Sequence, residues 1–266
     1  MSRLRVGDIV ARKSHGNDLL FKIIGFSHDR GERSCVLRGI TQRLIADSRE
    51  EDLIKVDPLV AQINKARTLG NIRSHETRQL RNFIRERLRN RPGKILHIDS
   101  DEDYLKDCLK FYKKAGLNPV GFFAEADQQP RHIKRLLVKN RPDILIVTGH
   151  DGIKKNADKY KLESYRFSKF YIESVKQARE FEEDKEKLCV FAGACQSFFE
   201  EIMKAGANFA SSPGRVLINS LDPSIVGKKV ALTSNNVYVT PEQISMLTVS
   251  GAAGIGGINT RGKLEL

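Results

Sequence analysis

Two apolar runs, each leading into a small polar loop, decide the fold: residues 144–152 are ILIVTGHDG, and residues 188–196 are LCVFAGACQ. Each run is short and uninterrupted by polar residues, which is typical of a strand buried on both faces of a parallel sheet. His150 and Cys195 lie at the exits of these runs, separated by 195 − 150 = 45 residues. Because functional crevices in such sheets lie beyond the carboxyl ends of the strands, we expect the imidazole and the thiol to meet at one edge.

The same alternation of strand and helix extends from Lys94 to the end of the chain. Strands are predicted over 95–98, 119–123, 144–148, 189–192 and 208–210, and helices over 103–115, 128–139, 168–181 and 196–205. This order predicts an α/β domain over residues 94–266, in three layers around a mostly parallel sheet. Beyond about residue 215 the pattern weakens, leaving a helix predicted over 241–247. The glycine-rich segment 251–257 lacks the G-x-G-x-x-G pattern and is interpreted as flexible or tightly packed, not as a nucleotide loop.

Residues 1–57 have a different pattern. Short strands are predicted over 6–10, 20–26, 35–39 and 44–46, separated by turns rich in Gly, Asp and Asn. Regularly spaced short strands of this kind indicate a small barrel, and an SH3-like barrel fits the length. Such modules commonly bind peptides or nucleic acid, and this one contains no evident catalytic set.

Residues 58–93 are predicted to form a basic helical linker. They contain nine Lys or Arg and two Glu, and so contribute +7 to the net charge of +13. Nucleic acid, an acidic protein or a polyanionic assembly could bind such a segment, and a solvated linker explains it equally well.

Composition excludes several classes of protein. No apolar run approaches the length of a membrane span, and the N-terminus lacks the apolar stretch of a secretory signal, so we expect an intracellular protein with no membrane partner. The four cysteines are scattered without a C-x-x-C pair. We therefore expect free thiols, with no zinc site and no cofactor.

Among these cysteines, Cys195 is the candidate nucleophile. It follows two small residues and precedes a predicted helix, whose N-terminus would stabilise a thiolate. Cys35, Cys108 and Cys189 have the features of buried core residues. Among the six histidines, only His150 is at a strand exit with glycine on either side, at Gly149 and Gly152.

Chain order then separates the classes of enzyme. No histidine follows residue 150, whereas papain-like enzymes, glutamine amidotransferases and nucleophile-elbow hydrolases all place histidine after the nucleophile. No G-x-S-x-G motif occurs either. The remaining order, histidine followed about 50 residues later by Ala-Cys, is that of the caspases.

The sequence as a whole resembles the YabG family of sporulation-specific cysteine proteases. The resemblance covers nearly the whole chain and is carried by VGDIVARKS (6–14), LRG (37–39), TGHDG (148–152) and FAGACQS (191–197). A weaker similarity to caspase- and gingipain-type peptidases lies in the histidine and cysteine blocks, and it implies a caspase-like α/β domain. Those enzymes have His-Gly where this chain has His150-Asp151-Gly152.

The resemblance implies a cysteine endopeptidase that processes spore coat and related proteins, in the mother cell cytoplasm and at the forming coat. Cleavage after arginine and self-processing are implied as well. Cys195 would attack the scissile carbonyl and His150 would act as acid and base. The backbone amides of Asp151 or Gly152 would join that of Cys195 in stabilising the oxyanion. An arginine-selective pocket requires a carboxylate, for which Asp101, Asp127 and Asp222 are the candidates.

Two alternatives remain open. The barrel, the basic linker and the α/β domain could form a non-catalytic regulator that binds nucleic acid or an assembly. A flavodoxin-like or receiver-like domain would explain the acidic pair Asp99 and Asp101, but no phosphate-binding glycine loop accompanies the pair. Asp99 is also a candidate helix cap.

Overall fold

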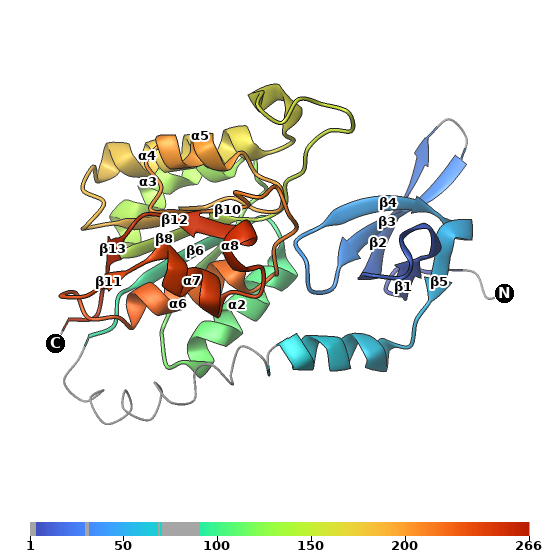
Figure 1. Cartoon of the computed structure of the whole chain (residues 1–266), viewed down its shortest axis with the longest axis horizontal. Coiled ribbons are helices and arrows are strands. Elements are labelled where there is room, and N and C mark those ends of the chain that lie inside the picture. The colour runs from blue at the N-terminus through green and yellow to red at the C-terminus, as the bar shows by residue number, and fades with distance from the viewer. Residues whose placement is uncertain (1–3, 30–31, 69, 71–90, 266) are drawn as a thin grey trace. The chain divides into compact units, whose positions relative to one another are not determined.

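The computed structural model describes residues 4–29, 32–68, 70 and 91–265. The chain divides into two compact units, Met1–His75 and Glu76–Leu266 (Figure 1). The division falls inside the predicted linker, most of which lies outside the described residues. Residues 58–68 are helical, as predicted. No helix in the described part of the chain is long and apolar enough to cross a membrane.

The first unit is an antiparallel sheet of five strands in the order β4-β3-β2-β1-β5. These strands are β1 (Ile9–Arg12), β2 (Leu20–Asp29), β3 (Glu32–Gly39), β4 (Ile45–Arg49) and β5 (Leu53–Lys55). Two short 3-10 helices, Lys13–His15 and Glu50–Asp52, occupy the turns. The predicted strands are confirmed with small shifts of their ends, and β5 was not predicted. One face is closed by an apolar cluster of Val10, Phe21, Ile23, Cys35, Leu37 and Leu53.

The second unit is built on a six-stranded sheet in the order β12-β10-β9-β8-β6-β7. Its strands are β6 (Ile95–Asp99), β7 (Val120–Phe123), β8 (Ile144–Thr148), β9 (Cys189–Ala192), β10 (Phe209–Ser211) and β12 (Ile255–Gly257). All neighbouring pairs are parallel except β10 and β12. Every residue of β6, β8 and β9 is buried, as expected for central strands covered on both faces.

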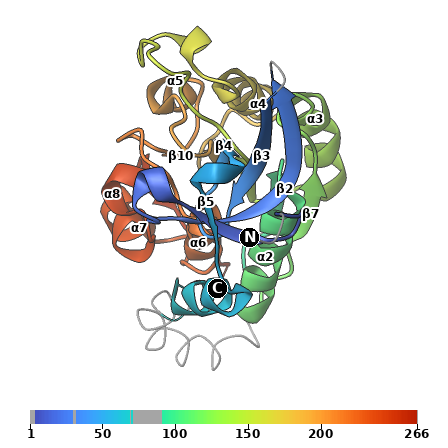
Figure 2. The same ribbon diagram turned by 90° about the vertical axis from the view of Figure 1, so that its right-hand side faces the viewer.

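Helices cover both faces of this sheet and complete a three-layer α/β unit (Figure 1). One face carries α3 (Gln129–Asn140), α4 (Ser168–Phe181) and α5 (Phe199–Lys204), and the other carries α2 (Glu102–Lys114) and α6 (Asp222–Ala231). Figure 2 shows the same separation of α3, α4 and α5 from α6 in a second view. The main apolar core joins α3 and α4 to the side chains of β6, β8 and β9 that face them.

The C-terminal part of the chain was the least predictable. Helix α6 was not predicted, whereas α7 (Pro241–Leu247) lies at the predicted residues, opened by a capping box at Thr240. A short helix α8 (Gly251–Gly254) leads into β12, and the small β11 (Tyr238–Val239) pairs with β13 (Thr260–Arg261). The glycine-rich segment is tightly packed: a Cβ on Gly257 would lie 2.3 Å from the Phe209 ring.

Candidate active site at the carboxyl ends of three neighbouring strands

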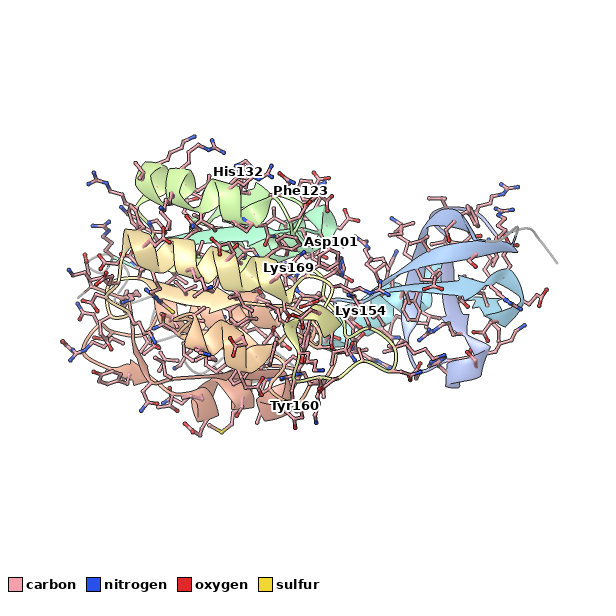
Figure 3. The ribbon with its side chains drawn as sticks, turned by 90° about the horizontal axis from the view of Figure 1, so that it is seen from above. Asp101, Phe123, His132, Lys154, Tyr160 and Lys169 are labelled. Carbon is pink, nitrogen blue, oxygen red and sulfur yellow. The ribbon has the colours of Figure 1, made fainter. Side chains whose placement is uncertain are left out.

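Strands β6, β8 and β9 lie side by side and deliver three polar side chains to one edge of the sheet. Asp99 pairs with Thr148, so Asp101 and His150 each lie two residues beyond a matched pair. Val147 pairs with Ala192, which places His150 and Cys195 three residues beyond matched positions. Figure 3 labels Asp101, which follows β6, at this end of the unit.

Three side chains hold His150 in place: the carboxylate of Asp101, the hydroxyl of Tyr171 and the ring of Tyr104. Its Nε2 lies 3.0 Å from Oδ2 of Asp101, and the side chains are 14% and 7% exposed. Tyr171 donates its hydroxyl hydrogen to the His150 carbonyl at 2.7 Å, and the Tyr104 ring lies 5.6 Å from the imidazole. Nδ1 has no hydrogen-bond partner among the described residues. A proton on Nε2, shared with Asp101, leaves the lone pair on Nδ1 as the basic site.

The second carboxylate oxygen of Asp101 also has hydrogen-bond partners. Its Oδ1 accepts the backbone N–H groups of Asp103 and Tyr104, both at 3.0 Å, and so caps the start of α2. The cap is therefore Asp101 and not Asp99, whose Oδ1 accepts the N–H of Asp101. A side chain with both oxygens engaged is held in one orientation, which in turn orients the imidazole.

Cys195 is buried in the loop that follows β9. Its Sγ accepts the backbone N–H of Ile218 at 3.1 Å. The helix predicted over 196–205 begins only at Phe199, so the prediction that its N-terminus stabilises the thiol was wrong. Gln196 has a left-handed backbone (φ 54°) and uses its own N–H on the carbonyl of Val216. The amide nearest the thiol therefore comes from a segment distant in sequence.

Gly193 permits the sharp exit from β9 that leads to Cys195. Its φ is 109°, a conformation that other residues rarely adopt, and a Cβ there would lie 2.5 Å from Oγ of Ser211. Ser211 donates to the carbonyl of Ala194 at 2.7 Å. The neighbouring strand β10 thus fixes the loop on one side.

Asp151 joins the histidine loop to the cysteine loop. Its carboxylate is buried and accepts the N–H groups of Gly152 and Phe167, each at 2.8 Å. It also accepts the hydroxyls of Ser168 at 2.5 Å and Ser197 at 3.0 Å. Burial raises the pKa of Asp151, and the hydrogen bonds from Ser168 and its other donors lower it in part.

Ser197 completes this connection. Its Oγ donates to Asp151 and accepts the N–H of Ala194 at 2.9 Å, one residue before the thiol. We call the chain Asp151–Ser197–Ala194 the loop bridge. No signal in the sequence identified Ser197, whereas Asp151 stood out because it interrupts the His-Gly pattern.

The predicted oxyanion donors differ in what they already bind. The N–H of Gly152 is engaged by the carboxylate of Asp151. The amides of Asp151 and Cys195 stay predictions for this role.

The three acids predicted for an arginine pocket are placed very differently. Asp101 contacts His150 and the start of α2. Asp127 is exposed in the turn after the outermost strand β7. Asp222 is fully buried and accepts the N–H groups of Asn219, Val249 and Ser250. Burial raises the pKa of Asp222. It therefore holds together the backbone that follows Ile218.

One further polar cluster lies beneath this edge and was not predicted. His97, Asp99 and Cys108 are fully buried, and their potential ligand atoms lie within 4.8 Å of one another. Nε2 of His97 lies 3.5 Å from Oδ2 of Asp99, and Nδ1 lies 3.1 Å from the Tyr112 hydroxyl. These residue types can bind a metal ion, and they equally form a buried ion pair.

Comparison with known proteins identifies the relatives of the chain. A model of the family described as YabG peptidase U57 matches residues 5–266. The sporulation-specific protease YabG of Bacillus subtilis (strain 168) is 39% identical over 282 residues, which cover 99% of this chain and 97% of that protein. No solved structure matches. The SH3-like and caspase-like assignments therefore stay predictions.

Proposed function

We propose, from the premise that the chain belongs to the YabG peptidase U57 family, that it is a cysteine endopeptidase of sporulation with Cys195 as its nucleophile. The observation that carries this proposal is the position of Asp101, His150 and Cys195 just beyond the carboxyl ends of three neighbouring parallel strands. A peptidase needs a nucleophile, a base and a group that orients the base, and these residue types supply all three.

The proposed reaction is acyl transfer through a thioester. The thiol gives its proton to Nδ1 of His150, and the thiolate sulfur attacks the scissile carbonyl. The imidazolium then protonates the leaving amine, and the neutral imidazole removes a proton from the water that hydrolyses the thioester. The carboxylate of Asp101, 3.0 Å from Nε2, keeps the ring oriented and stabilises its cationic form.

The hydrogen bond from the Ile218 amide supports the choice of Cys195 as the nucleophile. An N–H that points at Sγ stabilises negative charge on the thiolate, as a helix N-terminus would. Cys189, on β9 itself, is also buried, and burial raises the pKa of its thiol to about 12. The proposed chemistry belongs to Cys195, whose sulfur accepts the N–H of Ile218 and whose loop follows the strand next to that of His150.

Spore coat and related proteins are the proposed substrates, processed in the mother cell and at the forming coat. Cleavage after arginine is proposed with them, and both rest on the family resemblance. The arginines of the basic linker, residues 58–93, are then sites at which the protein would cleave itself. Membership of a peptidase family supports this function over a non-catalytic regulator that binds nucleic acid.

The test compares Cys195→Ala with Cys189→Ala, a matched buried cysteine on the strand that leads into the Cys195 loop. Hydrolysis of a spore coat protein extract and of arginyl fluorogenic peptides is followed for both variants. Loss of the nucleophile should lower kcat/KM at least about 10³-fold. Cys189→Ala should keep the activity of the wild type per folded molecule. Full activity in Cys195→Ala would contradict the proposal.

A further inference from the structure

Asp99 is a buried carboxylate that the proposed reaction does not use. It ends β6 and is fully buried beside His97 and Cys108, and the Tyr112 hydroxyl contacts Nδ1 of His97. Burying a charged carboxylate is costly unless a cation or several hydrogen-bond donors compensate for it. A group retained at this cost beside a candidate active site is a candidate functional group.

The sheet places Asp99 near the loop that carries Cys195, at a distance that a long substrate side chain can span. Asp99 pairs with Thr148 of β8, and the Thr148 hydroxyl donates to the carbonyl of Gly193 at 2.8 Å. Asp99 therefore lies two strand spacings from Gly193, roughly 10 Å at about 4.8 Å per strand. Cys195 follows Gly193 by two residues. A long, extended side chain bound beside the thiol is needed to cover such a distance.

The segment from Ile218 to Ser220 connects the same two places. The amide of Ile218 contacts Sγ of Cys195, and the carbonyl of Ser220 accepts a hydrogen bond from Sγ of Cys108 at 3.5 Å. Cys108 lies within 4.8 Å of the facing atoms of His97 and Asp99. The two residue steps from Ile218 to Ser220 span at most about 7 Å of chain. One short segment thus runs from the nucleophile to the Asp99 cluster.

The other acids near this edge have structural tasks. Asp101 orients His150 and caps α2, Asp151 forms the loop bridge, and Asp222 binds backbone amides. Asp127 is exposed beside the outermost strand. Asp99 differs because, beyond the N–H of Asp101 at Oδ1, its carboxylate faces the side chains of His97 and Cys108. Such side chains can move aside for a ligand more readily than backbone amides can.

We propose that Asp99 is the carboxylate that pairs with the guanidinium of the arginine on the amino-terminal side of the scissile bond. This inference rests on the proposed function and adds the residue that selects the substrate. A carboxylate binds guanidinium through two parallel hydrogen bonds, which a lysine ammonium does not reproduce. The carbonyl of Ser220 offers an additional acceptor for a guanidinium N–H. His97, held through Nδ1 by Tyr112, lines the same place.

The test uses two peptides that differ only in arginine or its uncharged isostere citrulline at that position. Wild type should cleave the arginine peptide far faster. Asp99→Asn should lower kcat/KM for the arginine peptide by about 10²- to 10⁴-fold, because the guanidinium loses its buried charged partner. Its rate on the citrulline peptide should stay within about threefold. Asp127→Asn is the matched control and should cleave both peptides as wild type does.

A charge-conserving variant covers the case in which Asp99→Asn does not fold. Asp99→Glu moves the carboxylate outward by one methylene, so its preference should shift from arginine towards norarginine, the analogue one methylene shorter. Cooperative thermal unfolding of each variant verifies its fold.

Distinct outcomes separate this inference from the proposed function. Retained arginine preference in folded Asp99→Asn would overturn the inference while leaving the cysteine mechanism intact. Stoichiometric metal in the purified wild type, lost in both Asp99→Asn and Cys108→Ser, would also overturn it, because the cluster would then be a metal site. If neither peptide is cleaved in a Cys195-dependent manner by the wild type, the proposed function itself fails.

Discussion

A charged group lies at each end of helix α4, the buried Asp151 beside its start and the half-buried Arg179 in its last turn, and the two groups have different roles. At its start, the carboxylate of Asp151 accepts N–H groups and the hydroxyls of Ser168 and Ser197. At its end, Arg179 donates to the carbonyls of Glu182, Leu188 and Gly206 and to Asn208. Each charge suits the helix dipole at its own end.

The difference lies in what each charge holds together. Arg179 ties the starts of β9 and β10, where no candidate nucleophile or base lies. Asp151 ties the loops that carry His150 and Cys195. Burial opposes both charges, lowering the pKa of Arg179 and raising that of Asp151. The comparison teaches that a buried charge is not in itself a mark of catalysis; the segments it joins decide its role.

The strongest test of the catalytic end is Asp101→Asn. Asparagine caps a helix as well as aspartate does, so α2 should be preserved while His150 loses its anionic partner. We expect kcat to fall by about 10²- to 10⁴-fold with both the arginine and the citrulline peptide. A loss confined to the arginine peptide would instead show that Asp101 binds the arginine of the substrate.

The opposite end is tested by Arg179→Met, which keeps the length of the side chain and removes its donors. Several buried carbonyls lose their partner, and the free energy of unfolding should fall by about 3 kcal/mol. Activity per folded molecule should stay within about twofold of wild type. Urea unfolding measures the stability, and active-site titration measures the activity per folded molecule. A loss of activity in fully folded Arg179→Met would contradict a purely structural role for Arg179.

The smallest expected effect comes from Ser197→Ala, which cuts the loop bridge but leaves Asp151 its other donors. Loss of one hydrogen bond costs about 1 kcal/mol. If this hydrogen bond stabilises the transition state by that amount, its removal lowers kcat by about fivefold to tenfold. Ser174→Ala is the matched control, since the Ser174 hydroxyl on α4 is buried and has no hydrogen-bond partner among the described residues. Equal effects of the two substitutions on kcat would show that the loop bridge does not contribute to catalysis.

Much of the central fold was predictable because its signals are local. The runs at 144–148 and 189–192 form β8 and β9 at the predicted residues, and α4 begins and ends as predicted. Helix α5 was overextended because Gln196 takes a left-handed conformation, which a sequence pattern does not reveal. Helix α6 was missed because it is buried almost all round and therefore has no polar face to create a period.

The candidate site was predictable in its members but not in its pairing. Strand exits selected His150 and Cys195, whereas the contact between Asp101 and His150 depends on the strand order β6-β8-β9. No local signal predicts that order. Ile218 and Ser197 act through a backbone amide and a hydroxyl, groups that are too common in any sequence to single out.

The amide contact at Cys195 also has a consequence for the timing of activity. Ile218 lies 23 residues beyond the cysteine, and the next residue, Asn219, is anchored to Ser250. A ribosome synthesises the chain from its N-terminus onward, so the thiol meets this partner only after Ile218 has left the ribosome. Until then, Cys195 in the nascent chain lacks the hydrogen bond from the Ile218 amide. If the protein has the proposed activity, cleavage of its own basic linker would have to wait until the segment around Ile218 had folded.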